Sequence, residues 1–244
     1  MMIVPVVAFG AWHVAHAQIL LASLRSEGNL PDVESHVIVY TDTPAAFSGY
    51  EVRKISPNGK ENKHQTTSNC YADALKLGHP IVPVSADMIC PTGMLAELER
   101  LAKTYKAVMV PVVRTESAAM RKALPQGDIS LTPRELCALA FQHLHPLQGL
   151  MYWDKLPSSM APTTVFRRVG NTIAAKCFHM HPLMLRLPAG FPLSPGIDGE
   201  LMARIRPEDC YVVTDSDEAV VFDLTDRAYN WSSGYLQRWK VDTT

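Results

Sequence analysis

Short, almost uninterrupted apolar runs alternate with amphipathic stretches along the first half of the chain. The runs are rich in valine and isoleucine and lie at residues 3–9, 37–40, 81–84 and 107–113. Runs this short and this apolar are typical of strands that are covered on both faces, as in a parallel sheet. The pattern also indicates a short strand within residues 50–55.

Helical periodicity fills the segments between these runs. Apolar residues recur every three or four positions over 15–24, 66–77 and 94–105, which predicts helices that each bury one face. This alternation of strand and helix predicts an α/β fold, arranged as a three-layer sandwich with a mostly parallel central sheet.

From about residue 125 the pattern becomes less regular. Thr132, Pro133 and Glu135 form a capping box with proline at the first helical position, which predicts a helix that runs to about residue 143. The remaining expected elements are strands at 163–168, 173–179 and 210–214, a short partner strand at 220–222, and a helix at 198–205 that Asp198 caps. No linker divides the sequence, so we expect one domain over residues 1–244.

The composition excludes two broad classes of protein. Of the 244 residues, 47% are hydrophobic and 19% are charged, so the chain can bury a substantial core and is not intrinsically disordered. Its 23 lysine and arginine residues nearly cancel its 24 aspartate and glutamate residues. The lack of a global basic field argues against a general nucleic-acid binder, and any phosphate site must be local.

The cysteines and the N-terminal residues indicate the cellular compartment of the protein. The five cysteines are scattered and form no C-x-x-C pair, which favours buried thiols in a reducing cytoplasm over a disulfide framework or a structural zinc site. The N-terminal residues form no positively charged leader, and no apolar run approaches the ~20 residues that span a bilayer. We therefore expect a soluble, cytoplasmic protein without a transmembrane segment.

One stretch near the C-terminus leaves a membrane contact open. Trp231, Tyr235 and Trp239 recur at near-helical spacing beside Arg238 and Lys240. Such an aromatic and basic stripe more often docks on the protein's own core than on a membrane surface. A weak peripheral membrane contact is the alternative.

Several well-known motifs are missing from the sequence. There is no G-x-x-x-x-G-K-[ST] and no G-x-G-x-x-G, which argues against P-loop NTPases and Rossmann dehydrogenases. There is also no G-x-S-x-G, which argues against an α/β-hydrolase.

Three of the expected strands end in an aspartate or close to one: Asp42, Asp87 and Asp215. In open α/β sheets, ligands bind beyond the carboxyl ends of the strands. Carboxylates there are well placed to hold a metal ion or a ribose hydroxyl. Each aspartate taken alone is better explained as a helix cap or a turn residue, but the three together favour a ligand site at one edge of the sheet.

Two further clusters have the composition of metal ligands. If the segment 177–182 is a strand, His179 and His181, two residues apart, would share a face and bind a divalent metal or a phosphate. The alternative is a hydrogen-bonded histidine pair. Asp215 and Asp217 form a D-x-D whose carboxylates would share Mg²⁺ or Mn²⁺ with substrate phosphates, unless they belong to a solvated acidic turn.

A polar helix face supplies one more candidate. His64, Thr67 and Tyr71 share a face of the helix expected around residues 66–77, if that helix extends back to His64. This face either lines the cleft or forms a polar helix N-terminus with capping side chains.

The order of these segments resembles that of bacterial glycosyltransferases of the GT-A type over roughly residues 3–223. The resemblance is carried by the valine-rich first strand, the strands that lead to Asp42 and Asp87, and the segments 178–182 and 213–218. It implies a GT-A-like fold that binds a nucleotide-sugar at the carboxyl edge of the sheet and transfers the sugar to an acceptor. The less regular region from about 125 to 244 would lie on the acceptor side.

The resemblance also implies a metal site. In this fold a D-x-D after a middle strand holds Mn²⁺ or Mg²⁺, which neutralises the leaving diphosphate. The corresponding residues are 85–87, where Asp87 is the only acid. His179 or His181 would complete the metal shell. Only one acid stands where the family usually has two, so the resemblance at this position does not by itself imply metal dependence or catalytic activity.

The donor site follows from the same resemblance. Asp42 would lie near the nucleoside, and Arg114 and Arg121 would offset the charge of the diphosphate. The donor-binding residues expected in this way are Trp12, His13, Asp42, His64, Asp87 and Arg114.

Glycosyl transfer builds negative charge on the departing diphosphate, which a cation or fixed arginine and histidine side chains stabilise. A carboxylate takes the proton of the acceptor, and the candidate bases are Asp198 and Glu200, with a plain helix cap as the alternative. Two other functions stay open. One is a catalytically inactive GT-A-like nucleotide-binding or scaffold protein. The other is a different metal-dependent α/β enzyme with the ligands His179, His181, Asp215 and Asp217.

Overall fold

The computed structural model of the chain describes residues 1–56, 63–104, 107–125, 127, 129–132, 135, 136, 139, 178–186, 210–212 and 221–225. The strand expected at 163–168 and the helix expected at 198–205 lie outside the described residues. Among the described residues, no helix is long and apolar enough to cross a membrane.

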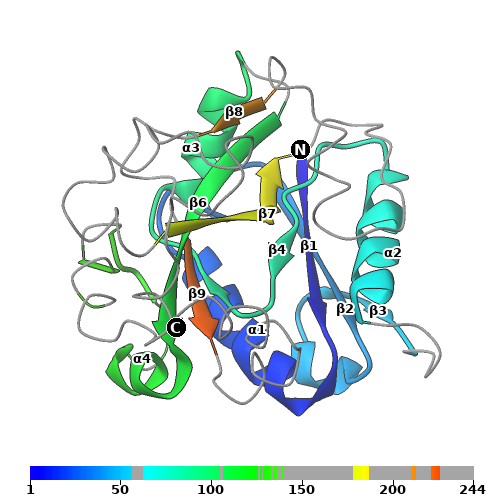
Figure 1. The fold of residues 1–244 in the computed structure, drawn as a ribbon. Coiled ribbons are helices and arrows are strands. Elements are labelled where there is room, and N and C mark those ends of the chain that lie inside the picture. Colours follow the sequence, from blue (N-terminus) through cyan, green and yellow to red (C-terminus); the bar gives the residue numbers. More distant parts are fainter. Residues whose placement is uncertain are drawn as a thin grey trace, which may run out of the picture.

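A four-stranded parallel sheet forms the centre of the first half of the chain (Figure 1). Its strands, in the spatial order β3-β2-β1-β4, are β1 (Met2–Ala8), β2 (Ser35–Thr41), β3 (Glu51–Lys54) and β4 (Val84–Ser85). All seven residues of β1 are buried, because this strand pairs on both edges and carries helices against its faces. The apolar runs at 3–9 and 37–40 and the short strand within 50–55 are thereby confirmed.

The apolar run at 81–84 makes a shorter strand than its pattern predicts. Regular pairing with β1 is limited to Val84–Ser85, and Ile81 forms an isolated bridge to Ile3. The physical reason is Pro83, which has no N–H to donate to a ladder in the middle of the run. The run is nevertheless buried as predicted.

The described helices of the first half are α1 (Gly10–Leu24), α2 (Lys63–Leu75) and α3 (Met94–Leu101). α1 contacts β1 and the short strand β5 (Met88–Ile89), and α2 contacts β1. The connection from β1 to β2 steps toward the β3 edge of the sheet, whereas the connection from β3 to β4 crosses to the opposite edge. Because both crossovers are right-handed, α1 and α2 lie on opposite faces of the sheet. The observed fold class is therefore α/β, as the sequence predicts.

The strands after β4 form a separate, mixed sheet rather than an extension of the first. It contains β5 (Met88–Ile89), β6 (Ala107–Glu116), β7 (Phe178–Arg186), β8 (Cys210–Val212) and β9 (Val221–Thr225). β8 and β9 run parallel to β6, whereas β7 is antiparallel to β6 and β5 is antiparallel to β9. The expectation of one mostly parallel central sheet is wrong for these strands. β4 ends after two residues, and the turn at Asp87 leads directly into β5.

Two local expectations from the second half can be compared with the structure. The strand at 220–222 pairs with β6 and β5, not with β8. The capping box is confirmed: the Thr132 N–H donates to Glu135 Oε2 at 2.8 Å, and the Glu135 N–H donates to Thr132 Oγ1 at 3.2 Å.

A buried junction joins the end of α1 to the start of α3. The side-chain amide of Asn29 donates to Pro91 O at 2.8 Å, and its Oδ1 accepts the Leu95 N–H at 2.9 Å. The N-cap residue of α3 is Gly93, which has no side chain to cap the helix. Asn29 therefore caps α3 from a distant part of the chain.

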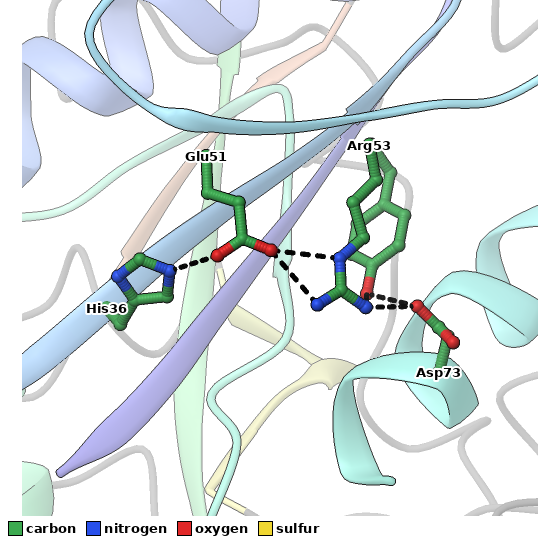
Figure 2. A network of polar contacts seen from close by, with 5 residues as sticks. His36, Glu51, Arg53 and Asp73 are labelled. Carbon is green, nitrogen blue, oxygen red and sulfur yellow. Dashed lines mark hydrogen bonds and ion pairs between the residues drawn. The ribbon is translucent and has the colours of Figure 1, made fainter. Parts of the chain in front are cut away.

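A polar network ties the edge strand β3 to β2 and α2 (Figure 2). Arg53 bonds Glu51 at 3.0 Å and Asp73 at 2.5 Å, His36 Nε2 lies 2.6 Å from Glu51, and Tyr40 Oη donates to Asp73 at 3.0 Å. The hydrogen bond with His36, followed by that from Arg53, lowers the pKa of Glu51. Burial alone would raise the pKa of Asp73, but its bonds with Arg53 and Tyr40 outweigh burial and lower it.

Substitution Arg53→Gln is expected to lower the free energy of unfolding by about 1 kcal/mol at neutral pH, because these side chains are about a third exposed and partly screened. Both carboxyl pKa values are lowered in the folded state. Their contribution is therefore present above pH ~4 and is lost as the pH falls through the lowered values. Urea denaturation should show the variant and the wild type converging near pH 3. Lys54→Gln removes one exposed charge from the same strand as a control, and an equal loss there would contradict a specific role for the network.

Candidate functional site

The order of the parallel strands defines where a ligand would bind. β2 lies on one side of β1 and β4 on the other, so the strand order reverses between β1 and β4. In open α/β sheets this switch point opens a crevice outside the carboxyl ends of the two strands. The segments there are the start of α1 after β1 and the turn at Asp87 after β4. In Figure 1, β1 and β9 both point toward the side of the molecule where α4 (Ser117–Ala123) lies.

Asp42 follows β2, and its side chain caps the N-terminus of α1. Its two carboxylate oxygens accept the Gly10 N–H at 3.1 and 3.2 Å, and Thr43 Oγ1 donates to the same carboxylate at 3.0 Å. The N-cap residue Phe9 makes no side-chain hydrogen bond, and the first turn contains no acid. Asp42 therefore supplies the missing cap, which is why α1 begins at Gly10 rather than at residue 15. The carboxylate is exposed at the edge of the sheet.

Aromatic and imidazole rings line the first two turns of α1. The rings of Trp12 and His16 stack with centroids 3.9 Å apart, and His13 lies 5.0 Å from both Phe9 and Trp12. His13 Nδ1 is 2.9 Å from Phe9 O, and His16 Nδ1 is 2.7 Å from Trp12 O. A carbonyl only accepts hydrogen bonds, so Nδ1 is the protonated nitrogen in both rings. Trp12 is partly exposed, whereas His16 is fully buried.

Charged groups from two distant segments of the chain act on His16. Burial is the largest influence and lowers its pKa, with the charge of Arg121 acting in the same direction. The hydrogen bond to Trp12 and the charge of Asp87 oppose this effect. Asp87, in the turn after β4, and Arg121, on α4, are therefore both close enough to His16 to interact electrostatically.

Asp87 is held by its own turn. Ser85 Oγ donates to Asp87 Oδ1 at 2.5 Å, and the side chain is half-buried. The structure thus brings the expected residues Trp12, His13 and Asp87 to one edge, together with Arg121 and with His16, which the sequence does not single out. A histidine on the buried side of an amphipathic helix has no sequence signal that distinguishes it from a core residue.

The other expected site residues are placed by their backbone alone. His64 lies in the first turn of α2, and Arg114 lies on β6 opposite Asp223. His179 lies on β7 opposite Val112, and the pairing of β7 with β6 is interrupted between Met180 and Leu185, where His181 lies. The residues Asp198, Glu200, Asp215 and Asp217 lie outside the described part of the chain.

Metal ligation remains a prediction. Within the described ranges, no group of three or more histidine, cysteine, aspartate or glutamate side chains is arranged to hold a metal ion. Asp87 contributes a single carboxylate, which already accepts the Ser85 hydroxyl. These side chains alone do not make a metal cage.

Comparisons with known proteins add no assignment: no family model matches the chain, and no curated protein matches it.

Proposed function

We propose that the chain is a GT-A-type glycosyltransferase that binds a nucleotide-sugar donor at the carboxyl edge between β1 and β4 and transfers the sugar to an acceptor. One observation carries the proposal: at the switch point of a parallel sheet, Trp12 stacks on His16, and the charges of Asp87 and Arg121 both act on His16. This is the position at which open α/β sheets bind ligands.

Each of these side chains has a role that suits such a donor. The partly exposed Trp12 ring offers a face on which a nucleobase stacks. The exposed Asp42 carboxylate accepts ribose hydroxyls beside the start of α1. Arg121 supplies positive charge for the diphosphate, whose negative charge grows as the sugar leaves. The Asp87 carboxylate accepts hydrogen bonds from the hydroxyl groups of the sugar and so orients the sugar.

The acceptor half of the proposal rests on the sequence. Asp198 or Glu200 acts as the base that takes the proton of the acceptor hydroxyl. No step is assigned to a metal, because the described side chains near Asp87 do not form a cage. Binding is therefore measured both with and without Mn²⁺.

A thermal-shift experiment tests donor binding. A panel of UDP-, GDP- and CDP-sugars is expected to contain at least one ligand that raises the melting temperature by several degrees, because a ligand at 100 times its Kd stabilises the folded state by about 2.7 kcal/mol. Asp87→Asn should abolish most of that shift. Glu27→Gln, an exposed carboxylate beyond the opposite end of α1, should leave it unchanged. No shift with any member of the panel would overturn the proposal.

A turnover assay separates an enzyme from a binding domain. The single carboxylate at residues 85–87 is the observation that favours a catalytically inactive GT-A-like nucleotide-binding protein. Such a protein would show the thermal shift but neither hydrolysis nor transfer of the donor sugar. Detectable release of nucleoside diphosphate, lost in Asp87→Asn, would decide for the enzyme.

A further inference from the structure

His16 is held in one position from two sides. Its Nδ1–H donates to the Trp12 carbonyl at 2.7 Å, and its ring stacks on the Trp12 ring at 3.9 Å between centroids. The side chain is fully buried although it lies only two turns into α1. The orientation of Trp12, a partly exposed residue in the first turn of α1, therefore depends on His16.

The surroundings of His16 are poorly suited to a second positive charge. Of the elements that pack against α1, neither β1 nor β5 contains a titratable residue. Among the described residues, the charged and titratable groups that act on His16 include Asp87 from the turn after β4, Arg121 from α4 and His13 from α1 itself. A protonated His16 would be a buried cation near Arg121 and His13, with Asp87 as the opposing carboxylate.

We infer that His16 is a proton-sensitive positioning residue: in its neutral form it supports Trp12 and the first turns of α1, and its protonation loosens the candidate site. The inference goes beyond the proposed function and holds whichever ligand binds at this edge. It predicts that the position of Trp12 and the stability of the first turns of α1 depend on pH.

The direction of the effect follows from linkage. The pKa of His16 is lowered by burial in the folded state, while the unfolded chain keeps the ordinary value near 6.5. Below that value the unfolded state binds a proton that the folded state does not bind. The free energy of unfolding therefore begins to decrease as the pH falls through about 6.5. It decreases further until the pH reaches the lowered pKa of the folded state.

The first experiment compares melting temperatures between pH 8 and pH 5.5, without ligand, for the wild type and His16→Asn. The asparagine amide can still donate to the Trp12 carbonyl but cannot titrate. The wild type is expected to lose several degrees more than the variant on acidification. His79→Asn, in a partly exposed turn, should follow the wild type. Parallel losses in the wild type and His16→Asn would overturn the inference.

A fluorescence titration decides the matter if His16→Asn does not fold. A protonated imidazole quenches an indole that it contacts, so the emission of the wild type should drop as His16 titrates. Trp12→Phe keeps an aromatic ring for stacking but removes this reporter. His13 also lies beside Trp12, so the titration is repeated with His13→Asn. A quenching transition below pH 6.5 that is absent from Trp12→Phe and kept in His13→Asn supports the inference; an unchanged curve in Trp12→Phe, or a transition lost in His13→Asn, overturns it. Both experiments omit nucleotide-sugars, so their outcome is independent of the thermal-shift test.

Discussion

Gly28→Ala is expected to lower the free energy of unfolding by about 2–5 kcal/mol, as measured by urea denaturation. A Cβ at residue 28 would lie 2.5 Å from Gly93 Cα and 2.8 Å from Gly93 N. Neither backbone atom can rotate away, so the segment that begins α3 would have to move. The move would strain the hydrogen bonds from Gly93 N–H to Glu27 O and from Ala96 N–H to Gly28 O. Overpacking of this kind costs about 1–3 kcal/mol. The positive φ of residue 28 adds about 1–2 kcal/mol for any residue with a Cβ.

Gly78→Ala provides a control that isolates the close approach. Gly28 has φ +70° and Gly78 has φ +76°, so alanine meets a similar left-handed strain of about 1–2 kcal/mol at both positions. Nothing lies within 4 Å of a Cβ built at Gly78. The two variants therefore differ in the contact with Gly93. Equal losses of stability would show that this contact has no energetic weight.

Asn29→Ala is expected to lower the free energy of unfolding by about 3–4 kcal/mol. Asn29 is fully buried, and its side chain bonds Pro91 O, Ser26 Oγ and the Leu95 N–H at 2.8 to 2.9 Å. Truncation leaves the Leu95 N–H and the Pro91 carbonyl buried without these bonds, and an unsatisfied buried group costs about 1–3 kcal/mol. The N-terminus of α3 also loses its cap.

The control for this variant is Gln18→Ala, the truncation of a polar side chain on the exposed side of α1. Surface substitutions usually change stability by less than about 0.5 kcal/mol. Urea denaturation of both variants measures the difference directly. A loss of under 1 kcal/mol in Asn29→Ala would mean that solvent or a rearranged side chain satisfies the junction.

Several elements could be predicted because both partners of each interaction are close together in the sequence. The capping box of Thr132 and Glu135 is one case, since the two residues are three positions apart. The strand β1 is another, because a run of apolar residues needs no knowledge of its neighbours to be recognised as buried on both faces. The carboxyl-edge positions of Asp42 and Asp87 followed from the same strand pattern.

Other features could not be predicted, because their partners are far apart in the sequence. α1 begins earlier than its periodicity indicates because Asp42, 32 residues away, accepts the Gly10 N–H. α3 has glycine at its N-cap and takes its capping oxygen from Asn29, 66 residues away. The division of the strands into two sheets depends on the chain leaving β4 after two residues, where no local signal marks the change.

The sequence by itself determined the α/β class, the buried strands and the aspartates at the strand ends, because hydrophobic periodicity and turn chemistry act over a few residues. The tertiary structure alone decided that Asp42 caps α1 and that Asp87 and Arg121 act on a buried His16. The physical reason is that capping bonds and electrostatic interactions depend on distance in space. Only the packing of α1 against the sheet brings Asp42 to the Gly10 N–H, and Asp87 and Arg121 close enough to His16 to interact electrostatically.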